Sequence, residues 1–216
     1  MSGNKPLLAD CEHVFLVEGY SDLHFLSAFL RHLNRDNGVY IHQFTGKKRM
    51  LNPGLLSDFL TPKVLAEKKT IGLLLDADEN AAATAQAVRD RMHALTDLQL
   101  TEASWHEQPD GPRIGFFVMP DGASPGTIET LLWNGFADDE RHRSMKGVVL
   151  DFQQKMTGLG WKGGETDKGR IAAFLSAAHP EDPRLGPGAR EGAFNLDTPG
   201  LSRLRRFLEV LPLRAT

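Results

Sequence analysis

The stretch GLLLDADEN, residues 72–80, runs from apolar residues directly into acidic ones. Residues 70–78 predict a strand buried on both faces, which is typical of a parallel sheet covered by helices. Asp76 and Asp78 stand at its carboxyl end. Ligands of open parallel sheets bind beyond the carboxyl ends of the strands, so the pair marks a candidate site. The alternative is structural, with Asp78 or Asn80 capping the helix that begins near residue 81.

An earlier apolar run ends in the same way. VFLVEG, residues 14–19, predicts a first strand with Glu18 at its end. If the two strands are neighbours, Glu18, Asp76 and Asp78 meet at one edge of the sheet, where their like charges repel one another. A divalent cation would remove this repulsion. Oxygen ligands without cysteine or paired histidines favour Mg²⁺ or Mn²⁺ over Zn²⁺.

The remaining apolar patterns alternate between strand and helix. Strands are expected at 14–19, 39–44, 70–78 and 115–120, and helices after each of them, beginning near residues 21, 54, 81 and 127. Such alternation implies right-handed crossovers and a mostly parallel, Rossmann-like α/β sheet flanked by helices. Ser21 is expected to cap the first of these helices.

The second part of the chain has a different pattern. Residues 148–156, 167–178 and 197–211 predict helices, whereas residues 179–192 are rich in proline and glycine and predict a loop. We therefore expect one domain over 1–216, with an α/β core at 12–135 and a helical extension at 136–216 that packs on the sheet.

Composition excludes several classes of protein. The 216 residues suit one α/β domain. The single cysteine, Cys11, permits no disulfide framework, which indicates a reducing, cytoplasmic location. The first residues lack an apolar core of signal-peptide length, and no segment reaches the ~18 apolar residues of a membrane span. We therefore expect no membrane association.

A nucleic-acid partner requires a local basic patch, because the net charge of −3 provides no general attraction. Lys47, Lys48 and Arg49 follow the second predicted strand and form the best such patch. They could contact phosphates at the same edge as the carboxylates. The alternative is a solvated loop.

The combination FLVEGYSD followed by LLLDAD resembles the Toprim domain, which is shared by topoisomerases, bacterial primases and the nucleases of the overcoming-lysogenization-defect (OLD) family. Glu18, Asp76 and Asp78 match the Glu-Gly and Asp-x-Asp positions of that pattern. The chain also resembles small stand-alone Toprim-like bacterial proteins of uncharacterised function. In that comparison GTIETLL supplies Glu129 and TDKGRIAAFL supplies Lys168.

The resemblance to OLD-type nucleases implies a function. It implies that Glu18, Asp76 and Asp78 hold one Mg²⁺ or Mn²⁺ ion and that Glu129 contributes to a second. Glu18 and Lys168 would then be catalytic, with Lys168 neutralising charge at the scissile phosphate. The implied activity is metal-dependent hydrolysis of DNA or RNA, in partnership with a separate ATPase. A homo-oligomer is compatible with this expectation.

Two related activities are not expected, and two alternatives stay open. Topoisomerase activity is not expected, because neither Tyr20 nor Tyr40 lies where a nucleophile would be presented, and primase activity is not expected because we find no zinc module. The same fold could hold a metal or nucleotide without cutting, which would leave Glu129 and Lys168 far from the aspartates. A small-molecule phosphotransferase would instead need a closed pocket.

Overall fold

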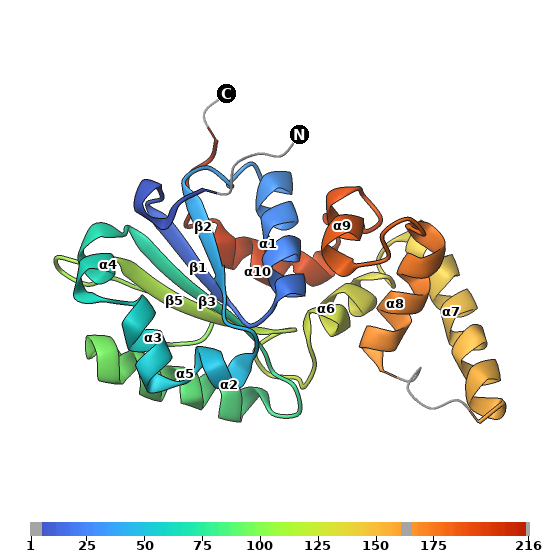
Figure 1. Ribbon diagram of the computed structural model, residues 1–216. Helices are drawn as coiled ribbons and strands as arrows, with labels where there is room; N and C mark the ends of the chain where they lie inside the picture. The colour runs from blue at the N-terminus through green and yellow to red at the C-terminus, as the bar shows by residue number, and fades with distance from the viewer. Residues whose placement is uncertain (1–5, 161–165, 215–216) are drawn as a thin grey trace.

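The computed structural model describes residues 6–160 and 166–214, and its centre is a five-stranded sheet (Figure 1). The strand order is β2-β1-β3-β5-β4. All pairs are parallel except β4–β5, which is antiparallel. The strands are β1 (His13–Val17), β2 (Val39–Gln43), β3 (Thr70–Asp76), β4 (Trp105–His106) and β5 (Arg113–Met119).

Helices cover both faces of this sheet, as the continuous apolar strands require. One face carries α1 (Tyr20–His32), α6 (Ile128–Gly135) and α10 (Ser202–Leu208). The other face carries α2 (Lys47–Met50), α3 (Pro53–Phe59), α4 (Pro62–Glu67) and α5 (Ala81–Thr96). Every residue of β1 is buried. The predicted α/β class and its mostly parallel sheet are therefore confirmed.

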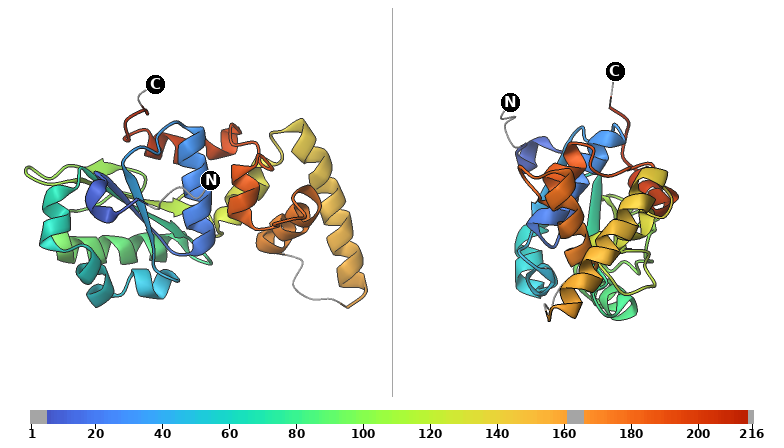
Figure 2. Two further views of the ribbon diagram at one scale, coloured as in Figure 1. Left: turned by 45° about the horizontal axis from the view of Figure 1, so that its top comes forward. Right: turned by 90° about the vertical axis from the view of Figure 1, so that its right-hand side faces the viewer.

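The remaining helices extend from one side of the sheet (Figure 2). They are α7 (Glu140–Gly158), α8 (Asp167–Ala178) and α9 (Leu185–Arg190), and short 3₁₀ turns form η1 (Leu8–Asp10) and η2 (Pro199–Leu201). Helix α8 packs on α6 and α7, whereas α10 lies on the sheet, where Phe207 stacks on Trp105. Among the described residues, no helix is long and apolar enough to cross a membrane.

Two predictions for this half need correction. Helix α7 begins at Glu140 rather than near residue 148, because Asp139 caps it by accepting a hydrogen bond from the Arg141 N–H. The loop expected at 179–192 is also wrong for residues 185–190, which form α9, in which Leu185 and Ala189 are buried.

Glycine explains why α9 can pack so closely on α1. A Cβ added at Gly186 would lie 2.0 Å from the Cβ of His24, so a side chain there would clash with the backbone-proximal part of α1. The glycines and prolines of this segment therefore permit close packing of a short helix, whereas the same composition is more often found in loops.

Candidate functional site

The ends of β1 and β3 lie side by side, as the sequence predicted. Val17 is paired in register with Leu74, and the two strands run parallel. Glu18, the next residue after β1, reaches across so that its Oε1 accepts a hydrogen bond from the Asp76 N–H at 2.9 Å. The Glu18 side chain is only 12% exposed. The two acidic residues therefore share one edge of the sheet.

Asp76 connects this edge to helix α6. Its Oδ1 accepts a hydrogen bond from the N–H of Ile128 at 3.0 Å, in the first turn of the helix, where the partial positive charge of the helix dipole favours an anion. Glu129 follows directly and is buried, with its Oε2 accepting a hydrogen bond from the Thr127 hydroxyl at 2.7 Å. The start of α6 therefore brings Glu129 to Asp76.

Asp22 is a fourth acidic residue at this edge, and sequence reasoning missed it. It is buried in the first turn of α1, and its Oδ2 accepts a hydrogen bond from the Gly19 N–H at 2.8 Å. Gly19, rather than the expected Ser21, is the N-cap residue of this helix. The four-residue spacing from Glu18 to Asp22 in EGYSD was the available signal. We call Glu18, Asp22, Asp76 and Glu129 the carboxylate cluster.

Burial and mutual repulsion make Glu18, Asp22 and Asp76 hard to ionise. Burial raises the pKa of Glu18 to about 7 and that of Asp22 to about 6. It also raises the pKa of Asp76 well above its usual range, and repulsion from Asp22, Glu18 and Glu129 adds to that effect. The cluster thus concentrates negative charge in a poorly hydrated position, where a cation would relieve the repulsion.

Asp78 lies at the exposed end of the same edge. It does not cap α5, because Asn80 does so by accepting a hydrogen bond from the Ala83 N–H at 2.9 Å. The backbone of Asp78 adopts a φ of 52° and forms a bridge with Gly126 in the segment before α6. Its side chain is 57% exposed and accepts a hydrogen bond from Lys47.

The predicted basic patch also lies at this edge. The Lys47 Nζ is 3.8 Å from Glu18 Oε1, and the Gly46 N–H donates to the Glu18 carbonyl at 2.6 Å. Lys48 and Arg49 are exposed on the same short helix, α2. Lys47 therefore supplies the cluster with a positive charge from the protein itself.

Lys168 approaches the cluster from another direction. It is exposed in the first turn of α8, and its positive charge offsets part of the rise that burial causes in the pKa of Asp22. Lys168 and Glu129 also line one pocket, of about 170 Å³. The structure therefore places Glu129 next to Asp76 and Lys168 next to Glu129 and Asp22, although Lys168 lies far along the chain from all three.

The chemistry of the cluster suits a hard divalent cation, because every donor is a carboxylate oxygen. Within residues 6–160 and 166–214, however, no three acidic, histidine or cysteine side chains are close enough as they stand to hold one ion. Glu18 and Asp76 use one oxygen each for backbone N–H groups, and Asp78 binds Lys47. An ion shared by three carboxylates therefore requires side chains to change rotamer.

Comparison with known proteins places the chain in a family. A family model described as "Protein of unknown function (DUF3226)" matches residues 12–212, and the chain belongs to this family. No curated protein matches the chain.

Two solved structures are similar to it. The C-terminal region of the Burkholderia pseudomallei OLD protein is 17% identical, with a TM-score of 0.46 over 93% of this chain and 96% of that one. The corresponding region of the Xanthomonas campestris pv. campestris OLD protein is 18% identical, with a TM-score of 0.43 over 92% and 93%. Both are OLD proteins, the group that the sequence resemblance named.

Proposed function

We propose that this member of the DUF3226 family is a metal-dependent phosphodiesterase that hydrolyses nucleic acid, with its site at the carboxyl ends of β1 and β3. One observation carries the proposal. Four carboxylates from β1, α1, β3 and α6 converge, three of them with a raised pKa, and lysines from α2 and α8 flank them. Such perturbed carboxylates are typical of functional sites.

Mg²⁺ or Mn²⁺ is the cofactor that this donor set suits. Glu18, Asp76 and Asp78 would hold one ion, and Glu129 would contribute to a second. The ions would supply an activated water and neutralise the phosphate. Binding would also remove the repulsion that raises the pKa of Asp76.

The lysines of the site have separate roles. Lys168 is exposed beside Asp22 and would stabilise the negative charge that develops on the phosphoryl group during hydrolysis. Lys47 balances the charge of Glu18 and Asp78 and would be released as an ion enters. The exposed Lys48 and Arg49 would contact backbone phosphates, which positions nucleic acid without reading its sequence.

The proposed partner beyond nucleic acid is a separate ATPase. This part of the proposal rests on the resemblance to OLD-type nucleases. The residues of the site do not themselves point to an ATPase.

A cleavage assay tests the proposed activity. Wild type, Lys168→Ala and Lys63→Ala would be incubated with labelled single-stranded and duplex DNA and RNA, with Mg²⁺ or Mn²⁺. Lys63 lies on α4, which directly precedes the start of β3 and so is at the opposite end of this strand from Asp76, and its side chain is 79% exposed, so it is a matched control. Lys168→Ala should cut roughly a hundredfold more slowly, the usual loss for one preorganised electrostatic group, whereas Lys63→Ala should match wild type. Equal cutting by all three would remove Lys168 from the site.

A second candidate is a binding module that holds a metal or nucleotide without cutting. The ion pairs of Lys47 with Glu18 and Asp78 favour this candidate, because they leave fewer carboxylate oxygens for the two ions that cleavage would use. The presence of Glu129 in the cluster and the proximity of Lys168 to it favour the nuclease. Metal-dependent stabilisation without cleavage of any substrate would decide for the binding module.

A further inference from the structure

A pocket next to the carboxylate cluster has no role in the function proposed so far. It lies between the start of α1, the start of α8 and the segment leading into α9, and its volume is about 170 Å³. Its walls include Tyr20, His24, Lys168, Ile171, Arg184 and Leu185. We call it the Tyr20 pocket. Because Glu129 also lines it, the pocket adjoins the cluster.

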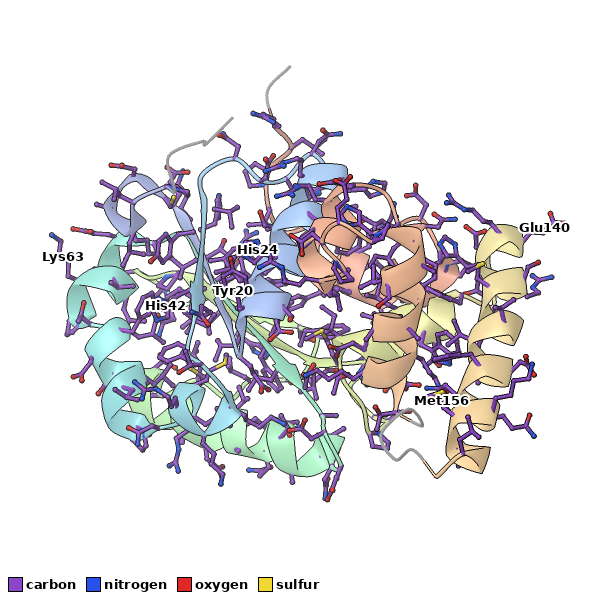
Figure 3. All side chains as sticks on the ribbon, turned by 45° about the vertical axis from the view of Figure 1, so that its right-hand side comes forward. Tyr20, His24, His42, Lys63, Glu140 and Met156 are labelled. Carbon is purple, nitrogen blue, oxygen red and sulfur yellow. The ribbon has the colours of Figure 1, made fainter. Side chains whose placement is uncertain are left out.

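The pocket combines an aromatic ring, an apolar wall and two cations. Tyr20 is 56% exposed, and its ring packs edge-on against His24 at a centroid distance of 4.1 Å (Figure 3). Ile171 and Leu175 of α8 supply apolar surface. Lys168 is exposed in the first turn of the same helix.

Arg184, the N-cap residue of α9, also lines the pocket. Its guanidinium makes two hydrogen bonds of 2.6 Å to Asp182, yet its side chain remains 63% exposed. Arg184 and Tyr20 line the same pocket, and Tyr20 adds to the effect of Asp182 in raising the pKa of Arg184. A phosphate could therefore be bound close to the ring.

The volume limits the size of the ligand. Pockets for drug-sized molecules occupy about 300–1,000 Å³, so about 170 Å³ suits a smaller group, and the Tyr20 ring in its wall favours an aromatic one. A nucleobase stacks on an aromatic face whatever its identity, and neighbouring cations bind the phosphates of the strand. Glu129 of the carboxylate cluster lines the same pocket as Tyr20, so a base held on the ring lies next to the carboxylates.

We propose that the Tyr20 pocket binds one unpaired nucleobase of the substrate, stacked on Tyr20. This inference rests on the proposed function and specifies its substrate class as single-stranded or locally unpaired nucleic acid. A base inside a duplex is stacked and paired and cannot enter such a pocket without being turned out of the helix, which costs a few kcal/mol. The pocket therefore selects against intact duplex.

Binding, measured separately from cutting, tests the inference. Fluorescence anisotropy would give the Kd of a labelled single-stranded oligonucleotide and of its duplex, with Ca²⁺ replacing Mg²⁺ and strand integrity checked on a gel. The variants would be Tyr20→Leu, Tyr20→Phe, which keeps the ring, and Phe152→Leu. Phe152 is a matched control, since it is an aromatic residue 51% exposed on α7 and does not line the pocket.

Wild type should bind the single strand more tightly than the duplex. Tyr20→Leu should weaken single-strand binding by about fivefold to about 150-fold, which is what a stacking contribution of about 1–3 kcal/mol per base corresponds to. Tyr20→Phe should retain most of the affinity, and Phe152→Leu should not differ from wild type. The expected effect on duplex binding is small.

Three results would overturn the inference: no binding of single strand by wild type, a preference for duplex, or equal effects of Tyr20→Leu and Phe152→Leu. The proposed function fails separately. Tyr20-dependent binding without cleavage in Mg²⁺ would remove the nuclease and keep the base pocket. Cleavage of duplex that Tyr20→Leu leaves unchanged would keep the nuclease and remove the pocket.

Discussion

Replacing Glu18 by glutamine should stabilise the metal-free protein, and the effect should depend on pH. Burial raises the pKa of Glu18 from 4.5 to about 7 in the folded state. Between these values the folded protein binds more protons at this position than the unfolded chain, so the free energy of unfolding falls as pH rises. At 1.36 kcal/mol for each unit of pKa, Glu18 costs about 3 kcal/mol at pH 8. Glutamine keeps the side-chain oxygen that accepts from Asp76 but carries no charge.

The assay is thermal or urea unfolding of wild type and Glu18→Gln in EDTA across pH 5 to 8. The advantage of Glu18→Gln should be about 3 kcal/mol at pH 8, roughly 6–12 °C in Tm for a chain of this size, and should shrink to about 1 kcal/mol at pH 5. Glu79→Gln is the control, because Glu79 is exposed at the same edge. A difference in the free energy of unfolding between Glu18→Gln and wild type that does not change with pH would refute the claim that burial raises the pKa of Glu18. The absence of any difference at pH 8 would refute it as well.

Other parts of the account make further predictions. Lys47→Met should increase the apparent affinity for Mn²⁺, because it removes the cation that pairs with Glu18 and Asp78. A metal titration followed by thermal shift would measure this affinity. Weaker binding by the variant would show that Lys47 supports the metal site instead. Gly186→Ala should lower the free energy of unfolding by roughly 1–3 kcal/mol, because the added methyl group clashes with His24. Urea denaturation would measure this, and an unchanged free energy of unfolding would contradict the close packing of α9 on α1. Gly147→Ala, in the middle of α7 with open space around it, should instead stabilise by roughly 0.5–1 kcal/mol, and destabilisation would contradict that open setting.

The strand-end carboxylates could be predicted because their positions depend on local pattern alone. A continuous apolar run such as 70–75 has to lie inside a parallel sheet, and the residue after it has to emerge at the ligand-binding edge. Glu18 and Asp76 followed from that rule and from the order of the elements.

The place of Asp22 in the cluster and the existence of α9 could not be predicted from local pattern. Asp22 reads as an ordinary polar residue in the first turn of a helix, and only the turn of the chain at Gly19 directs it into the cluster. Segment 179–192 has the composition of a loop. That Gly186 instead permits close packing of a helix becomes clear only when the position of α1 is known. The docking of α8, which brings Lys168 to Asp22, is likewise set by tertiary packing that no local pattern encodes.

The central claim, that the carboxylate edge binds a divalent cation, is tested most directly by the Tm of three proteins with and without Mn²⁺. The proteins are wild type, the double variant Asp76→Asn with Asp78→Asn, and Asp58→Asn, which changes an exposed aspartate on α3. A ligand that binds only the folded state stabilises it by about 2.7 kcal/mol at a concentration of 100 Kd, or roughly 5–11 °C. The account predicts this rise for wild type and Asp58→Asn and its loss in the double variant. A rise of equal size in all three proteins, or no rise in wild type at any Mn²⁺ concentration, would contradict it.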